Sequence, residues 1–555
     1  MTSARTPVSR RQFLKNTALA AGAGLAAPWL SSCSPPRKMA AVKIARGPFQ
    51  PTWESLAQNY QCPAWFQDAK FGIWAHWSAQ CVPEQGDWYA RQMYIQGHSD
   101  YEHHLKTYGH PSKAGFMEID HLWKAENWQP DKLLDLYVRA GAKYFVALAN
   151  HHDNFDNYKS RHHAWNSVNV GPKKDLIGIW AKEARARGLR FGVTNHSAHA
   201  WHWFQSAYAY DAEGPLAGVR YDGFNLTKAD GRGQWWDGLD PQELYTGPNV
   251  VMPDGLTSVK ALHEWFDHSN PWTEAVPPHN PQFTRTWFLR CQDLVDKYRP
   301  DLLYFDDTEL PLGQAGLDIA AHYYNASLKW HGGDMQVVLN GKNLAYEHRR
   351  ALVEDYERGF ADDIKPQPWQ TDTCIGSWHY QKDIHYKSVA QVARMLTDIV
   401  SKNGNLLLNI PVRGDGTIDD REMAFLDGLT KWMDANGEGL FGSRPWKVFG
   451  EGPSKVQGGM FNENKVEFGA QDIRFTSKGA TLYAYFLGWP SDGKLTIESF
   501  AAGAPDKPAL LEKPVGQLTL LGSAEPVEWT RDTAGLHVTL PATKPGNDVF
   551  ALKVV

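Results

Sequence analysis

The chain has 555 residues, which is long enough for one large domain and a smaller second one. Its composition, with 42% hydrophobic and 21% charged residues, is that of a globular protein, and a net charge of −5 gives no reason to expect nucleic acid or an anionic membrane surface as a partner. The 24 Trp and 22 Tyr residues are unusual. Their flat faces suit the apolar side of sugar rings, although core packing is the alternative explanation for most of them.

Residues 1–33 have the features of an export signal rather than of a folded domain. Arginines precede an apolar run, 18–30, that is too short for a typical membrane span. The stretch 9–15 (SRRQFLK) matches a bacterial twin-arginine signal, and LSSC at 30–33 resembles the lipobox at which lipoproteins are cleaved and lipidated on Cys33. We therefore expect an exported protein, periplasmic or anchored through a lipid on Cys33, with a plain cleavable signal as the alternative. Residues 34–60 are predicted to be a linker.

Between residues 61 and 444, β-rich runs alternate with amphipathic helices, which is the pattern of an α/β fold. Asp175 and Ser388 stand where they can cap two of the helices. Strands are predicted at 71–76, 143–149, 190–194, 302–306, 336–340 and 406–410. Units of this kind over this length favour a (β/α)8 TIM-like barrel over a doubly wound sheet, with two barrel strands left unplaced.

The stretch 204–283, rich in Gly, Pro and Asp, is too long for an ordinary loop in a compact domain, so it is predicted to be functional or else disordered. Its Trp235-Trp236 pair can form a subsite for the leaving group of a substrate or can serve packing alone. After Pro445 the pattern changes to alternating strands separated by turns, and residues 445–555 are predicted to form an antiparallel β-sandwich.

Apart from Cys33, the cysteines are scattered along the chain without the paired spacing of a metal site: Cys62, Cys81, Cys291 and Cys374. A disulfide can form between two of them in an oxidising compartment, and the sequence does not identify the pair.

Catalytic residues of a TIM barrel stand at the C-terminal ends of its strands. The predicted strands lead into imidazoles, carboxylates and a lysine, at His76, His151, His152, His196, Asp306, Asp307 and Lys342. A single histidine at such a place is more often only a hydrogen-bonded strand end. This number of chemically active side chains at one rim indicates a functional site.

Two chemistries fit these residues. One is metal-dependent hydrolysis, with His151, His152 and Asp306 as ligands. Adjacent strand residues point to opposite faces, however, so the two histidines are expected not to share an ion, and no His-x-His spacing supplies another set. The other is glycoside hydrolysis, which needs two carboxylates and hydrogen-bonding groups for sugar hydroxyls. The sequence favours glycoside hydrolysis without a metal or other cofactor.

Several blocks between about residue 65 and residue 445 resemble the retaining α-L-fucosidases of glycoside hydrolase family 29. The similar blocks are FGIWAHW at 71–77, NHHDNF at 150–155, GPKKD at 171–175, GLRFG at 188–192, VSKNGNLLLN at 400–409, DGTI at 415–418 and NGE at 436–438. No single block is decisive, but their order and spacing together are specific.

The resemblance implies that Asp306 is the nucleophile and that Asp307 points away from the sugar ring. It places the acid/base at Glu357, in DYERG at 355–359, with Glu354 as the alternative. In a retaining enzyme these carboxyl groups lie about 5–5.5 Å apart, with the nucleophile ionised and the acid protonated. The implied sugar-binding residues are His76, Asp87, Trp88, His151, His152, Tyr304, Lys342 and Trp378.

This sequence departs from the family pattern at three places. Tyr304 stands where a Trp is common, Lys342 replaces an expected Arg and cannot form the same bidentate fork, and His196 lies in a block that usually reads Tyr-Tyr-Ser. The resemblance as a whole implies hydrolysis of terminal α-L-fucosyl bonds in fucose-containing oligo- or polysaccharides. Because of the departures, a related glycosidase such as an α-L-galactosidase is one alternative, since an apolar pocket rejects one extra hydroxyl only weakly. A catalytically silent carbohydrate-binding lipoprotein is the other.

Overall fold

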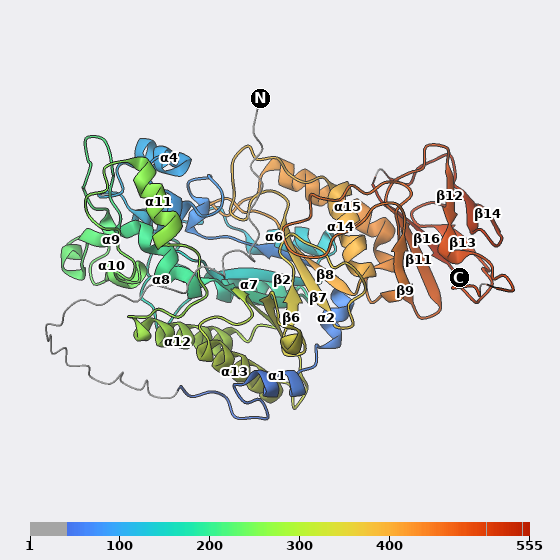
Figure 1. Ribbon diagram of the computed structural model, residues 1–555, viewed down its shortest axis with the longest axis horizontal. Helices are drawn as coiled ribbons and strands as arrows, with labels where there is room; N and C mark the ends of the chain where they lie inside the picture. Colours follow the sequence, from blue (N-terminus) through green and yellow to red (C-terminus); the bar gives the residue numbers. More distant parts are fainter. Residues whose placement is uncertain (1–41, 507, 547) are drawn as a thin grey trace, which may run out of the picture. The chain divides into compact units, whose positions relative to one another are not determined.

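A closed barrel of eight parallel strands forms the centre of the catalytic region, as predicted (Figure 1). The computed structural model describes residues 42–506, 508–546 and 548–555. The barrel strands follow one another in sequence order: β1 (Phe71–Ala75), β2 (Tyr144–Asn150), β3 (Arg190–Asn195), β4 (Leu302–Thr308), β5 (Val338–Lys342), β6 (Val353–Asp355), β7 (Trp369–Cys374) and β8 (Gly404–Asn409). Strand β8 returns to β1, with Leu406 opposite Phe71, and so closes the barrel.

Helices cover the outside of the barrel between successive strands: α6 (Pro130–Arg139), α7 (Leu176–Ala186), α12 (Pro281–Tyr298), α13 (Gln314–Trp330) and α14 (Val389–Ser401). After β8 the chain forms α15 (Asp420–Asn436). The predicted caps are confirmed. The Asp175 carboxylate accepts a hydrogen bond from the backbone N–H of Gly178, and Ser388 forms a capping box with Gln391, which satisfies N–H groups that the first helical turn leaves free.

The two strands that the sequence left unplaced are β6 and β7. Strand β6 has only 3 residues, which is too short for a recognisable pattern. Strand β7 reads WQTDTC and is buried throughout, so it carries buried polar side chains where a hydrophobic run is expected. Gln370 and Asp372 on this strand are both bonded to other buried polar groups inside the barrel.

Part of the predicted linker belongs to the folded domain. Residues 53–59 form the helix α1 (Trp53–Asn59). The ring of Tyr60 stacks on Tyr324 of α13 at 4.6 Å, and Asn325 accepts a hydrogen bond from the backbone of Phe49 at 3.0 Å. The predicted export signal, with Cys33, lies outside the described residues.

The long stretch between β3 and α12 consists of short helices joined by loops. It contains α8 (Ala200–Trp203), α9 (Asp222–Asn225), α10 (Pro241–Leu244) and α11 (Val259–Ser269). Trp235 stacks on His121 at 4.2 Å and donates to Glu118, and Trp236 is buried against Gly231. The tryptophan pair therefore serves packing.

The C-terminal region forms two antiparallel sheets around an apolar core (Figure 1). One sheet has the order β13 (Leu518–Leu520), β16 (Phe550–Val554), β11 (Thr481–Phe486), β10 (Ile473–Lys478), β9 (Arg444–Glu451). The other has the order β12 (Lys494–Ile497), β15 (Leu536–Thr539), β14 (Glu528–Arg531). Bonds from Trp432 to the carbonyl of Val549 and from Tyr485 to that of Asn436 hold this domain against α15.

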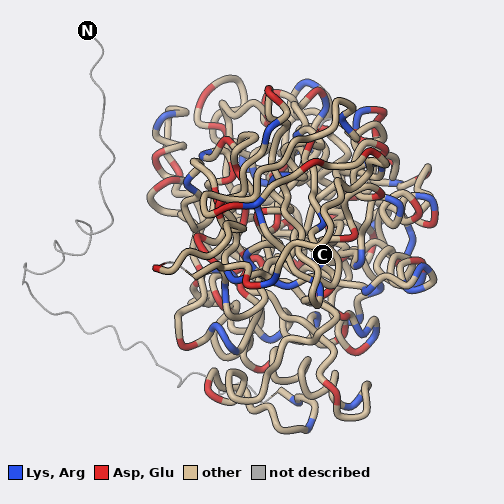
Figure 2. The backbone as a smooth tube through the Cα atoms, turned by 90° about the vertical axis from the view of Figure 1, so that its right-hand side faces the viewer, with Lys and Arg blue, Asp and Glu red and all other residues tan. Residues whose placement is uncertain are grey.

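Basic and acidic residues are interspersed along the backbone (Figure 2). Within the described part of the chain, no helix combines the length and apolar character needed to cross a membrane. The four described cysteines are free thiols.

Candidate active site

The C-terminal ends of the barrel strands bring the predicted side chains together. His76 follows β1, His151 and His152 follow β2, and His196 follows β3. Asp306 lies near the end of β4, Lys342 ends β5, and Glu357 comes two residues after β6. Because all eight strands are parallel, these positions meet at one rim of the barrel.

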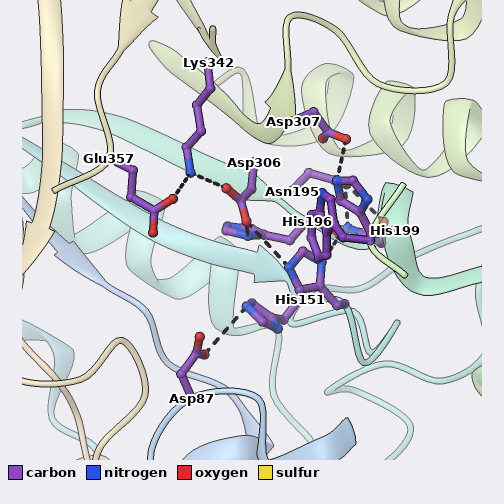
Figure 3. A network of polar contacts seen from close by, with 12 residues as sticks. Asp87, His151, Asn195, His196, His199, Asp306, Asp307, Lys342 and Glu357 are labelled. Carbon is purple, nitrogen blue, oxygen red and sulfur yellow. Dashed lines mark hydrogen bonds and ion pairs between the residues drawn. The ribbon is translucent and has the colours of Figure 1, made fainter. Parts of the chain in front are cut away.

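One ammonium group joins the two predicted catalytic carboxylates. Lys342 Nζ contacts Asp306 Oδ1 and donates a hydrogen bond to Glu357 Oε2 at 2.6 Å, and Figure 3 shows the lysine between them. Two oxygens that bond to the same nitrogen can be no more than about 6 Å apart, the sum of two hydrogen-bond lengths. Glu354 instead bonds Tyr356 at 3.0 Å and does not line the cavity, so the geometry favours Glu357.

The two carboxyl groups differ in charge state. Burial alone would raise the pKa of Asp306, but the Lys342 ammonium and the imidazoles of His152 and His196 outweigh it and hold the pKa well below its usual range. For Glu357, burial dominates, and the charges of Asp372 and Asp306 add to it against the opposing effect of Lys342, so that its pKa rises to about 7. Asp306 is therefore ionised at neutral pH, whereas Glu357 holds a proton for much of the time.

Three histidines near Asp306 favour the neutral form, in which an imidazole ring offers one donor and one acceptor. Burial lowers the pKa values of His76, His151 and His152. His151 Nδ1 accepts from Gln80 at 3.0 Å, which leaves Nε2 as an N–H donor. His152 Nδ1 donates to the carbonyl of His196 at 2.7 Å, and its Nε2 lies 3.5 Å from the carboxylate of Asp306. Both ring nitrogens of His76 are buried without a partner. Sugar hydroxyls both donate and accept, so this mixture suits them.

A further carboxylate, Asp87, lies across the site from Asp306. Asp87 Oδ1 accepts a hydrogen bond from His379 Nδ1 at 2.7 Å, and His151 Nε2 lies 3.9 Å away. Ser78 donates to the other nitrogen of His379 at 2.9 Å and so fixes its tautomer. The next residue, Trp88, has a left-handed backbone with φ of 67°, which turns the chain into the following helix.

These residues surround a cavity of about 580 Å³. Most of the predicted site residues line it: His76, Asp87, Trp88, His151, Asp306, Lys342, Glu357 and Trp378. His152 and Tyr304 are not among the lining residues. Tyr304 is fully buried, and its hydroxyl donates to Asp372 at 3.1 Å, so it supports the site from beneath rather than from the wall.

The structure adds lining residues that the sequence did not indicate. Trp272 and Glu274 come from the long stretch before α12, and Met460 and Phe461 come from the C-terminal region. Asp307, which the sequence placed at this rim and which the resemblance expected to point away from the sugar ring, also lines the cavity and pairs with His199 at 2.9 Å. No motif marked Trp272, Glu274, Met460 or Phe461. The high tryptophan content was the only signal for Trp272, and it did not single that residue out.

The expectation that His151 and His152 diverge is wrong. Both lie beyond the end of β2, where strand alternation no longer applies, and their ring centroids are 4.3 Å apart. Together with His196 they place ligand atoms within 4.8 Å of one another. The positions of His151 and His152 along the chain therefore give no reason against a shared ion, and a chelator tests metal dependence.

The comparisons with known sequences agree over nearly the whole chain. A family model described as Alpha-L-fucosidase matches residues 38–438, and a model described as Alpha-L-fucosidase C-terminal domain matches residues 467–554. Tissue alpha-L-fucosidase of Homo sapiens is 27% identical over 529 residues, covering 91% of each chain. Alpha-L-fucosidase of Branchiostoma floridae is 25% identical over 526 residues, covering 92% of this chain and 93% of its own.

Solved structures agree as well. The structure of Thermotoga maritima alpha-fucosidase in complex with fucose is similar, with a TM-score of 0.65 and 26% identity over 91% of this chain and 100% of that chain. Alpha-L-fucosidase isoenzyme 1 from Paenibacillus thiaminolyticus, at 21% identity and a TM-score of 0.59 over 91% of this chain and 99% of that one, shares the fold.

Proposed function

Because the chain belongs to the α-L-fucosidases of glycoside hydrolase family 29, we propose that it removes terminal α-L-fucosyl residues from oligo- or polysaccharides with retention of configuration. In this proposal Asp306 is the nucleophile and Glu357 is the acid/base. The substrate is a fucose-containing glycan, and the enzyme acts from the end of the chain.

The observation that carries the proposal is the contact of both carboxylates with Lys342. It holds one oxygen of each carboxyl group within about 6 Å of the other, which is compatible with the spacing of about 5–5.5 Å between the carboxyl groups of retaining glycosidases. The opposite pKa shifts support the same roles, because a nucleophile must be ionised and an acid must hold a proton.

The reaction then has two balanced steps. Asp306 attacks C1 of the sugar while Glu357 gives its proton to the glycosidic oxygen, so the C1–O bond breaks and the leaving group departs as an alcohol. Glu357 next takes a proton from water, whose oxygen attacks C1 and displaces Asp306. Fucose is released, and both carboxyl groups return to their starting states.

The lining of the cavity supports a 6-deoxy sugar. Trp74 and Trp378 both line the cavity with ring centroids 5.3 Å apart, and they offer an apolar surface for the methyl group of fucose. His76, His151 and Asp87 offer polar groups for the hydroxyls. An α-L-galactoside, which carries one more hydroxyl, is therefore expected to be the poorer substrate.

The test is Asp306→Ala, assayed on an aryl α-L-fucoside. Turnover is expected to be abolished, and azide is expected to restore it with formation of the fucosyl azide of inverted configuration, because azide occupies the space of the missing carboxylate. Near-normal activity of this variant would remove Asp306 from the mechanism. Wild-type assays with a chelator and on the matching α-L-galactoside distinguish the metal-dependent hydrolase and the galactosidase. A wild type that is inactive on every aryl glycoside would favour the silent binding protein.

We also propose export by the twin-arginine route and anchoring through Cys33, on the basis of residues 1–33. Cys33→Ser is expected to move the protein from the membrane fraction to the soluble periplasmic fraction of a bacterial host. Replacing Arg10 and Arg11 together by Lys is expected to retain it in the cytoplasm. An unchanged membrane fraction in Cys33→Ser would argue against the lipid anchor.

A further inference from the structure

The cavity wall beside the acid/base is completed by a loop from the C-terminal region. This loop, residues 457–463, contributes Met460 and Phe461 to the lining. It lies between the two parts of the chain that match the family models, 38–438 and 467–554, so neither match accounts for it.

Backbone hydrogen bonds fasten the loop to the segment that carries Glu357. The N–H of Phe461 donates to the carbonyl of Glu357 at 2.9 Å, and the N–H of Asn462 donates to that of Arg358 at 3.0 Å. Gly459 and Phe360 exchange a pair of bonds at 2.9 and 3.2 Å, as in a short antiparallel ladder. The position of Phe461 is therefore fixed relative to the acid/base.

Phe461 is held in an unfavourable state that packing does not explain. Its side chain is 60% exposed, although a phenyl ring gains free energy from burial. Its backbone φ is 55°, in the left-handed region that residues with a Cβ avoid. A strained, exposed aromatic residue at the wall of a cavity is typical of a binding site rather than of a structural position.

The position of Phe461 determines which part of a bound substrate it contacts. A general acid protonates the oxygen of the leaving group, so the leaving group must lie against Glu357. Phe461 is bonded to Glu357 through the backbone and shares the same cavity, so it stands on the leaving-group side. Arg358, Ser377 and Glu274 line the cavity as well and supply polar groups for hydroxyls.

We propose that Phe461, with Met460 beside it, is the platform of a subsite that binds the sugar next to the scissile bond by stacking on its apolar face. The inference rests on the proposed function and adds to it the residues that bind the sugar on the leaving-group side. Aromatic rings bind sugars in this way because one face of a pyranose presents mainly C–H groups, while its hydroxyls point outwards to polar partners.

The experiment compares a substrate that has a second sugar with one that has none. Phe461→Ala and Phe461→Trp are assayed on α-L-fucosyl fluoride, whose leaving group is a single atom. They are also assayed on the best substrate in a panel of fucosyl-galactose and fucosyl-N-acetylglucosamine disaccharides. For Phe461→Ala, kcat/KM is expected to fall about tenfold on the disaccharide, as for loss of one aromatic contact, and to stay within about twofold on the fluoride. Phe461→Trp is expected to keep disaccharide activity.

Phe224→Ala is the matched control, because Phe224 is another exposed phenylalanine, 46% accessible, that does not line the cavity. It is expected to change neither rate. Equal effects of Phe461→Ala on both substrates, or no effect on either, would overturn the proposed subsite, as would a wild type that cleaves the fluoride but no disaccharide. A wild type that cleaves neither would instead contradict the proposed function itself.

Discussion

Lys342 determines the charge states of Asp306 and Glu357, the two proposed catalytic residues. Its side chain is 7% exposed, so its ammonium interacts with both carboxylates in a medium of low dielectric constant. Burial alone would lower the pKa of Lys342, but Asp306 and Glu357 raise it well above the usual value. The lysine therefore stays charged, keeps Asp306 ionised and limits the rise in the pKa of Glu357. An arginine here would carry the same charge but could not place it at a single point between two oxygens.

The pKa of Glu357 predicts the alkaline limb of the pH profile. The acid must be protonated, and its pKa is about 7, so kcat/KM on a substrate with a poor leaving group should be level below this pH and fall about tenfold per pH unit above it. Because the pKa of Asp306 lies well below its usual range, the nucleophile should cause no loss of activity near pH 4–5. The measurement is kcat/KM from pH 4 to 9.

Two variants test whether Glu357 causes the loss of activity above pH 7. Glu357→Gln should lower kcat/KM on unactivated fucosides by about 10²–10⁴ and should remove the limb, while affecting activated aryl fucosides much less. Glu354→Gln is the control, since Glu354 bonds Tyr356 away from the cavity, and it should keep the limb. An unchanged limb in Glu357→Gln would show that another group supplies the proton.

At the residue scale, the sequence indicated which side chains stand at the rim of the barrel but not how they contact one another. Asp306, Glu357 and the histidines, which strand ends and family blocks mark, lie together at this rim. That Lys342 contacts both carboxylates could not be predicted, since it depends on the relative positions of three different strand ends. The burial of Tyr304 beneath the cavity was missed for a related reason, because its partner Asp372 lies on a strand that carries no hydrophobic pattern.

At the scale of elements, the pairing of two loops positions Glu357, the proposed acid/base. Gly359 lies so close to the loop 457–463 that a Cβ there would stand 2.1 Å from the carbonyl oxygen of Gly459. Such a contact is impossible without movement of the backbone. Gly359 is thus the residue that permits the ladder between this loop and the segment of Glu357.

Gly359→Ala should therefore displace Glu357 while leaving its carboxyl group intact as a proton donor. A shift of about 1 Å in a catalytic group costs on the order of a hundredfold in rate, so kcat/KM on fucosyl disaccharides should fall by about that factor. Activated aryl fucosides, which need little acid assistance, should be affected less. Gly546→Ala is the control, because a Cβ at Gly546 meets no atom within 4 Å. Equal losses on both substrate types would argue against a positioning role for the loop pairing.

The elements that the sequence predicted are those marked by a local sequence pattern. Six barrel strands are marked by apolar runs, and two helix caps by their capping side chains. Strand β6 is too short, and β7 carries Gln370 and Asp372, which bond polar side chains of other strands inside the barrel. The loop 457–463 has no local signal, since its role comes from contact with residues about a hundred positions earlier in the chain.

At the scale of the whole molecule, the C-terminal domain is joined to the barrel by a buried charged network. Asp398 of α14 accepts hydrogen bonds from Lys402 at 2.8 Å and from Arg474 of β10 at 2.6 Å. All three side chains are at most 2% exposed. The same domain contributes the loop 457–463 to the cavity, where the loop is held by its own backbone bonds. Chain length and the change of pattern after Pro445 predicted two domains, but a network of this kind depends on which surfaces meet.

Asp398→Ala should destabilise the protein strongly, because it leaves two buried cations without their shared carboxylate. Breaking a buried pair in this way costs about 3–5 kcal/mol. The measurement is the free energy of unfolding from chemical denaturation, together with kcat/KM well below the transition, which should stay close to normal while the loop keeps its own backbone bonds. Glu512→Ala removes an exposed partner of Lys447 and should leave the unfolding curve unchanged. If Asp398→Ala unfolds like the wild type, the network does not hold the two domains together, and the apolar and backbone contacts at α15 must do so alone.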